Sequence, residues 1–264
     1  MDERSQALFD RLLQSKKYGA VCRDTLQRVA EECSARHKKP KEAEKAAKEK
    51  LHGITGAFLT PAESKRLYGR VEELRAGDED GLTQILEQHA STRERLPLAA
   101  MDALYARIFE ITEPPRRILD LACGLNPVYL SARLSEDCRI VGVDINGECV
   151  HILNGAIGSP DRITGIHADL LSPDAIPSDR YDVALMFKIL PLLDRQKAGA
   201  AMDVMTAVNA RYLVISYPTR TLGGRDVGML ENYAAWMNAH MPDNRIAVEQ
   251  FVAGDELFYI LKEN

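Results

Sequence analysis

The sequence predicts an α/β protein whose largely parallel sheet ends in an antiparallel hairpin and follows a helical N-terminal region. Three observations predict this. Strand-length apolar segments alternate with helical segments beyond Pro114-Pro115, the first of these strands runs into a turn of small residues, and only Ala253-Gly254-Asp255 separates the last two strands. Strands joined by so short a turn are antiparallel, whereas longer helical connections favour parallel pairing.

The bulk composition is that of a soluble globular protein. With 264 residues, 45% hydrophobic and 28% charged, the chain can bury one large core or two modest ones. No apolar run approaches the roughly 20 residues needed to cross a bilayer, and Met1-Asp2-Glu3-Arg4 is unlike a signal peptide. Five cysteines without C-x-x-C spacing indicate reduced thiols. We therefore expect a cytoplasmic protein with no membrane partner and no metal site.

Charge is distributed unevenly along the chain. The formal net charge is −5, yet residues 16–50 hold 11 Lys and Arg against 6 Asp and Glu, a balance of +5 that leaves −10 on the remainder. Such asymmetry indicates a polyanion partner, although a solvated helix face is the alternative for any single charged run.

The N-terminal region is predicted to be helical because apolar residues recur at helical spacing. Pro40 is suited to the first turn of a helix over 41–51, and Thr60 begins a capping box whose helix stops at Gly77. The other apolar stripes are Leu8, Leu12 and Leu13; Leu26, Val29 and Cys33; Leu82, Ile85, Leu86 and His89; and Met101, Leu104, Tyr105, Ile108 and Phe109. The double proline that follows predicts a boundary between a helical domain, 1–112, and a second domain, 113–264.

The second domain is predicted to contain a seven-stranded sheet. Its strands are expected at 118–122, 140–144, 162–167, 181–187, 213–217, 246–251 and 257–261. Parallel β/α units that end in an antiparallel hairpin are typical of Rossmann-like methyltransferases, whereas dinucleotide dehydrogenases usually continue with parallel units.

The turn after the first strand predicts the kind of ligand. It carries Gly124 and then Asn126-Pro127, without the G-x-G-x-x-G pattern that accommodates a pyrophosphate. S-adenosylmethionine is nucleotide-like and has no phosphate, so it fits this turn. Asp144, at the end of the second strand, is placed to accept hydrogen bonds from both ribose hydroxyls. The alternative for Asp144 alone is a turn-forming role.

The third strand is followed by Asp169-Leu170, the next position on the ligand side of the sheet. The Asp169 carboxylate is able to accept from the adenine amino group while a backbone N–H serves a ring nitrogen. A helix N-cap is the alternative role. The ligand's carboxylate needs a cation, for which the segment from His89 to Arg95 offers candidates.

Several long motifs resemble one known family. They are HASTRER (89–95), LDLACGLNP (119–127), FKILPLLDRQ (187–196) and YPTRTLGGR (217–225), supported by LHGITGAF (51–58), GM (228–229) and ENY (231–233). Together they closely resemble the aminoglycoside-resistance 16S rRNA methyltransferases that modify a guanine at N7 in the decoding A-site. The resemblance implies a monomer with a helical domain that docks on the 30S subunit and a Rossmann-like domain that binds S-adenosylmethionine.

The resemblance also implies roles for particular residues. Arg95 would bind the methionine carboxylate, and the rest of the donor pocket would be His89, Ala90, Ser91, Phe58, Ala122, Gly124, Asp144, Asp169, Leu170, Phe187 and Gln196. The residues facing the target nucleotide would be Lys188, Arg195, Arg225 and Met229. Taken locally, His89 could be a packed core histidine, Lys188 a strand-end charge and Arg225 a solvated loop side chain.

The basic segment is expected to contact 16S rRNA phosphates and not DNA. The candidate residues are Lys16, Lys17, Arg36, Lys38, Lys39 and Lys41. Guanine N7 has a lone pair and no proton, so no residue is expected to act as a general base, and alignment of the reactants should supply the catalysis. The alternatives are methylation of a neighbouring adenine at N1, for which Trp236 is the sole tryptophan able to stack on a purine, and a nicotinamide-dependent oxidoreductase.

Overall fold

The computed structural model describes residues 1–55, 65, 67, 78–155, 162–219 and 228–264. Two predicted site residues, Phe58 and Arg225, lie outside the described residues. The helix predicted to begin near Thr60 and to stop at Gly77 also falls largely outside them.

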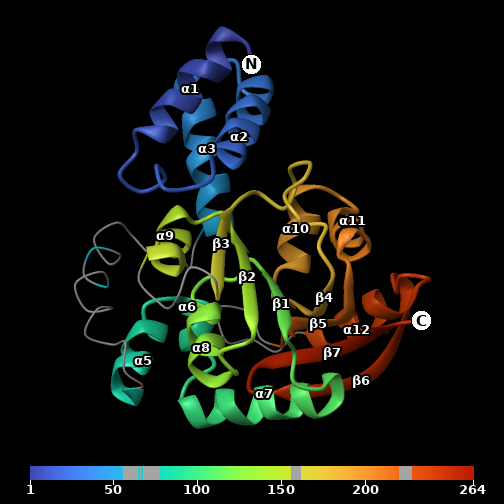
Figure 1. Cartoon of the computed structure of the whole chain (residues 1–264). Coiled ribbons are helices and arrows are strands. Elements are labelled where there is room, and N and C mark those ends of the chain that lie inside the picture. The colour runs from blue at the N-terminus through green and yellow to red at the C-terminus, as the bar shows by residue number, and fades with distance from the viewer. Residues whose placement is uncertain (56–64, 66, 68–77, 156–161, 220–227) are drawn as a thin grey trace.

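Three N-terminal helices form a module with its own hydrophobic core. They are α1 (Glu3–Leu13), α2 (Arg23–Arg36) and α3 (Pro40–Thr55). Asp2 caps α1 by accepting a hydrogen bond from Ser5 N at 2.7 Å, and Pro40 begins α3, where its missing N–H has no intrahelical partner to lose. The apolar stripes converge on a cluster that includes Leu8, Leu26 and Leu51. Figure 1 shows this module standing apart at one end of the molecule.

The helices that follow pack on the sheet. They are α5 (Glu79–Leu86), α6 (Ala90–Arg93) and α7 (Leu98–Thr112). Met101 and Ile108 of α7 belong to the same buried cluster as Ile118 and Val183 of the sheet. Among the described residues, the hydrophobic core of the N-terminal module ends at Ile54, and the helices that follow share a core with the sheet. This change of core lies earlier in the chain than residue 112. The domain boundary at 112/113 stays a prediction.

His89 does not continue the helical stripe that the sequence predicted. The helix α5 ends at Leu86, and His89 adopts extended backbone angles immediately before α6. The Thr92 hydroxyl contacts both the Leu86 carbonyl oxygen, at 2.6 Å, and the His89 carbonyl oxygen, at 3.0 Å. This side chain satisfies carbonyls at the end of α5 and so favours a helix end there.

The seven-stranded sheet is confirmed, with strand order β3-β2-β1-β4-β5-β7-β6. The strands are β1 (Arg117–Leu121), β2 (Arg139–Asp144), β3 (Ile163–His167), β4 (Tyr181–Phe187), β5 (Ala210–Pro218), β6 (Arg245–Ala253) and β7 (Glu256–Glu263). The first five pair in parallel, and β7 pairs antiparallel with both β5 and β6. The predicted terminal hairpin is therefore present.

Helices cover both faces of the sheet (Figure 1). One buried cluster contains residues of α7, α8 (Asn126–Arg133) and α9 (Gly147–Gly155), and the other contains residues of α10 (Leu190–Gln196), α11 (Ala200–Ala207) and α12 (Met229–Ala239). The chain crosses over between β1 and β4, which is where open α/β sheets bind ligands at their carboxyl edge. The residues just after these two strands, Ala122 and Lys188, both have positive φ, 56° and 58°. Non-glycine residues in this region cluster at functional sites.

Candidate active site

Asp144 joins the end of β2 to the turn after β1. Its Oδ2 accepts from Gly124 N and its Oδ1 accepts from Asn146 N, both at 2.8 Å. Burial raises the pKa of Asp144 above its usual value, against these two hydrogen bonds, which lower it. Each carboxylate oxygen has a second lone pair, so Asp144 is able to fix the turn and still accept from a ligand's hydroxyls.

His89 packs directly against Gly124. A Cβ at position 124 would lie 2.5 Å from Cε1 of the imidazole, and Gly124 has a φ of +52°, so only glycine fits here. The Nδ1 atom of His89 is buried and has no hydrogen-bond partner within the described residues. A turn without side-chain bulk beside an unpartnered buried nitrogen fits a polar nucleotide-like ligand such as S-adenosylmethionine.

The burial of His89 predicts an acid-sensitive fold. Burial, with the charges of Arg95 and Lys188, lowers the pKa of His89 from 6.5 to about 4. The unfolded state therefore binds a proton below pH 6.5 that the folded state excludes until about pH 4, so stability is full above pH 6.5 and falls as pH decreases. Between pH 8 and pH 5 the loss from this residue should be about 2 kcal/mol.

Urea unfolding of the native protein and of His89→Gln at several pH values measures this contribution. We expect the difference in unfolding free energy between the two proteins to shrink as pH falls from 7 to 5. Parallel pH profiles for the two proteins would contradict a neutral buried His89.

Arg95 forms a buried ion pair that the sequence did not predict. Its Nη2 donates to Oε2 of Glu256 at 3.0 Å, and its Nε lies 2.9 Å from Oε1. The Ser216 hydroxyl donates to Glu256 Oε2 at 2.5 Å, and Lys188 Nζ lies 3.6 Å from Oε1. Burial alone would raise the pKa of Glu256, but these cations and hydrogen bonds hold it below its usual value. The one local signal was an acid at the start of β7, directly before the apolar run 257–261.

The charges around Arg95 suit an anionic ligand. Its guanidinium lies over the Phe187 ring, 4.6 Å from the centroid, so two predicted donor-pocket residues are in contact. Lys188 also pairs with Glu94 at 2.5 Å, but the Glu94 side chain is 53% exposed, which weakens its influence inside the site. Arg95 and Lys188 face the buried carboxylate of Glu256, and burial raises the pKa of Asp120, the other buried acid that acts on Arg95, to about 7. This arrangement suits the methionine carboxylate as a further anion. Nε of Arg95 is buried and makes no hydrogen bond within the described residues, although it lies 2.9 Å from Glu256 Oε1.

Asp169 and Gln196 are held together by a residue from the N-terminal module. Arg28 of α2 donates from Nη2 to Asp169 Oδ2 at 2.6 Å and to Gln196 Oε1 at 3.0 Å. Oδ1 of Asp169 accepts from Leu171 N at 2.9 Å, and Leu170 between them is buried. The resemblance assigned Asp169 and Gln196 to one donor pocket. Arg28 was not predicted, because it carries no local signal that separates it from the other arginines of the basic segment.

A second buried network of hydrogen bonds lies next to the turn after β1. Asn126 donates from Nδ2 to Asp120 Oδ2 at 2.7 Å and accepts from the Tyr105 hydroxyl at 2.8 Å. Burial raises the pKa of Asp120 to about 7, against the opposing influences of Asn126 and Arg95. Asp120 lies inside the LDLACGLNP motif, yet its role as an anchor for Asn126 was not predicted.

The remaining predicted residues are spread around this centre. Ala90 and Ser91 form the half-buried first turn of α6. Arg195 is exposed on α10, and Met229 is partly buried as the first residue of α12. No hydrogen bond or ion pair within the described ranges joins either to Lys188.

All six predicted docking residues of the module are exposed. They are Lys16, Lys17, Arg36, Lys38, Lys39 and Lys41. Arg36 pairs with Glu32 within α2, and Lys39, just before α3, pairs with Glu42 of that helix. In the described part of the chain, no ion pair involves Lys16, Lys38 or Lys41, which leaves these charges available to an external polyanion.

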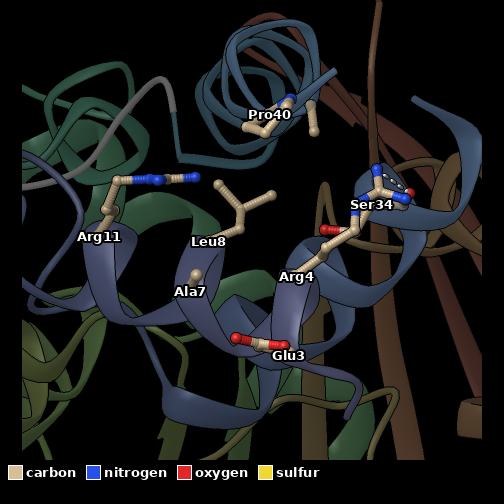
Figure 2. A pocket seen from close by; sticks show the side chains of 8 residues that line it. Glu3, Arg4, Ala7, Leu8, Arg11, Ser34 and Pro40 are labelled. Atoms are coloured by element: carbon tan, nitrogen blue, oxygen red, sulfur yellow. Dashed lines mark hydrogen bonds between the residues drawn. The ribbon is translucent and has the colours of Figure 1, made fainter. Parts of the chain in front are cut away.

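A cleft in the module is separate from the donor site. Figure 2 shows Leu8 projecting between α1 and α3, with Arg4 and Arg11 on either side. Arg4 donates to the carbonyls of Ser34, His37 and Lys38, and Arg11 pairs with Glu44. Arg4 and Arg11, the two cations of this cleft, thus hold the three helices together.

Within the described residues, no three His, Cys, Asp or Glu side chains come together in a way that would hold a metal ion. All five cysteines are buried and free. No helix in the described ranges is long and apolar enough to cross a membrane.

The sheet order, the terminal hairpin and the acids at the ends of β2 and β3 define a Rossmann-like fold of the methyltransferase type. The model of the ribosomal RNA methyltransferase family FmrO matches residues 14–260. The chain therefore belongs to this family.

Individual relatives match along nearly their whole length. A Serratia marcescens protein named 16S rRNA (guanine(1405)-N(7))-methyltransferase is 41% identical over 254 residues, which cover 96% of each chain. The crystal structure of the 16S rRNA methyltransferase RmtF in complex with S-adenosyl-L-homocysteine has 40% identity and a TM-score of 0.89, with both chains fully covered. The structure of the 16S rRNA methylase RmtB has 36% identity and a TM-score of 0.82, also with both chains fully covered.

Proposed function

We propose that this protein transfers a methyl group from S-adenosylmethionine to N7 of a guanine in the decoding A-site of 16S rRNA, within the 30S subunit, and so confers aminoglycoside resistance. It acts in the cytoplasm as a monomer. The proposal is carried by the placement of Arg95, Asp144 and Asp169 at one edge of the sheet, in a chain that matches rRNA methyltransferases over nearly its whole length.

The chain's own residues bind and orient the reactants. S-adenosylmethionine supplies an electrophilic methyl group on a sulfonium. Asp144 and Asp169 hold the adenosine part of the donor. Arg95, which lies over the Phe187 ring and pairs with Glu256, holds the methionine carboxylate. The N7 lone pair forms the new N–C bond as the S–C bond breaks, and the electron pair of that bond stays on sulfur. No proton moves, so alignment is the main catalytic contribution.

Access to N7 requires the target base to leave its helix. The major groove of A-form RNA is too deep and narrow for side chains, and extruding a base costs a few kcal/mol, to be offset by protein contacts. Tyr233 of α12 stacks on Tyr217 at 4.6 Å between ring centroids. Trp236 stacks on His240 at 4.5 Å, so the sole tryptophan already has a ring partner.

The modified nucleotide tests the proposed function. Purified 30S subunits are incubated with the protein and S-adenosylmethionine, and the 16S rRNA is digested and mapped by mass spectrometry. We expect one additional methyl group, at N7 of a decoding-site guanine. A methyl group at N1 of an adenine would overturn the assignment of the base while leaving the fold and the donor unchanged.

Charge reversal tests the docking role of the N-terminal module. We expect Lys38→Glu combined with Lys41→Glu to weaken 30S binding. The slope of the logarithm of the binding constant against the logarithm of the salt concentration should become shallower by about 1–2, because each phosphate contact releases counterions. Donor affinity should not change. Filter binding of labelled 30S subunits at several salt concentrations measures both effects.

The matched control reverses Arg116 and Arg139, two exposed arginines at the opposite edge of the sheet. It changes the net charge by the same amount and is expected to affect 30S binding much less. Equal losses in the two variants would mean that overall charge, and not the module, governs binding.

A further inference from the structure

The N-terminal module reaches the donor site through buried contacts. Thr25 of α2 donates from its hydroxyl to Asp169 Oδ2 at 2.8 Å, and Arg28 of the same helix approaches that oxygen with Nη2 at 2.6 Å and with Nε at 3.3 Å. Thr25 is fully buried and Asp169 is 3% exposed. One oxygen of the predicted adenine-binding carboxylate is therefore fixed by residues 141 and 144 positions earlier in the chain.

Arg28 also fixes a second predicted pocket residue. Its Nη2 donates to Oε1 of Gln196 at 3.0 Å, while Nε2 of Gln196 donates to Leu192 O at 3.2 Å within α10. Both polar ends of the Gln196 amide are thus engaged. A single guanidinium joins α2, the turn after β3 and the end of α10.

The same module is hydrogen-bonded to the loop after β2. Cys22 N donates to Ile145 O, and Gly147 N donates to Ala20 O, both at 2.8 Å. Val21 forms a bridge with Asn146, whose own N–H donates to Asp144. The module is therefore attached beside both acids that are proposed to hold the adenosine part.

We propose that Arg28 is a positioning residue of the donor site. From the docking module it holds Asp169 and Gln196 in the geometry that receives the adenine ring, and it couples the seating of the module to donor binding. This inference rests on the proposed function, because it takes Asp169 and Gln196 to belong to the donor pocket.

The geometry favours support of the ligand over competition with it. Arg28 and Thr25 use Oδ2 of Asp169, whereas Oδ1 accepts only from Leu171 N within the described residues. Oδ1 thus retains a lone pair for an exocyclic amino group. Hydrogen bonds from a guanidinium to a carboxylate are stronger than neutral ones and are often geometrically specific, so Arg28 holds the Asp169 carboxylate in one orientation.

Two ligands separate the adenosine end of the site from the methionine end. S-adenosylhomocysteine carries both parts, and 5′-methylthioadenosine lacks the amino-acid carboxylate. In calorimetric titrations of the full-length protein, we expect Arg28→Gln to weaken both ligands by the same factor of about ten, the scale of one lost charged hydrogen bond. Thr25→Val should weaken both ligands less, because it removes a neutral donor.

Arg23→Gln is the matched control. Arg23 is exposed on the same helix α2, lies over the Phe9 ring, and loses the same charge on substitution. The affinity of the Arg23→Gln variant for both ligands should equal that of the native protein. Thermal unfolding of each variant, recorded without ligand, separates loss of pocket geometry from loss of stability.

Arg28→Lys provides a second variant if the glutamine variant does not fold. Lysine keeps the charge but lacks the Nε contact to Asp169 and the planar geometry of the guanidinium. An equal loss of affinity for both ligands, smaller than tenfold, supports the proposal. Unchanged affinity, tighter binding, or a loss confined to S-adenosylhomocysteine would overturn it. If the native protein binds neither ligand, the proposed function itself fails, which the native titration alone reveals.

Discussion

Replacing Glu256 by alanine is expected to destabilise the protein by about 3–5 kcal/mol and to remove measurable donor binding. Glu256 and Arg95 are both only 6% exposed by side chain, and the carboxylate also holds Ser216 and Lys188. Its removal leaves a buried guanidinium without a counterion, and the cation proposed to receive the methionine carboxylate loses its fixed orientation.

Urea unfolding and calorimetric titration with S-adenosylhomocysteine measure the two effects of this substitution. Glu249→Ala is the matched control, because Glu249 lies on the neighbouring strand of the same hairpin and pairs with Arg107 at a half-exposed site, 3.8 Å apart. An exposed pair of this kind contributes about 0–1 kcal/mol. Similar destabilisation by both substitutions would contradict a central role for the Arg95–Glu256 pair.

Replacing Asp144 by asparagine is expected to weaken S-adenosylhomocysteine binding by about a hundredfold or more, since two hydrogen bonds to a charged acceptor become weaker or are lost. The amide also presents an N–H₂ group to one of the two backbone donors, Gly124 N or Asn146 N, which both point at the carboxylate in the native protein. The turn after β1 should therefore loosen as well.

Titration with S-adenosylhomocysteine and with 5′-methylthioadenosine tests the Asp144 substitution. Both ligands contain the ribose, so both should lose affinity. Asp137→Asn, an exposed acid just before β2, serves as the control and should leave both affinities unchanged. Native-like binding of either ligand by the Asp144 variant would remove Asp144 from the donor site.

Much of the fold was predictable because its signals are local. Apolar runs and short turns identified all seven strands, with ends displaced by a few residues, and the Ala253-Gly254-Asp255 turn predicted the hairpin. His89 was misplaced on a helical stripe, because spacing alone did not reveal that Thr92 would satisfy the carbonyls at the end of α5. Asp144 was singled out as an acceptor for ribose hydroxyls, and the structure adds that it binds the turn after β1 through Gly124 N.

The sequence by itself determined the succession of helices and strands along the chain. It also determined the turn that accepts a nucleotide-like ligand without phosphates, and the motifs of the rRNA methyltransferase family. Only the tertiary structure decided which charges meet. Arg95 pairs with Glu256 across 161 positions, and Arg28 reaches Asp169 and Gln196 across 141 and 168. Hydrophobic periodicity reports burial within one element, whereas the partner of a buried charge is chosen by the packing of distant elements, because an unpaired charge inside the core is too costly to retain.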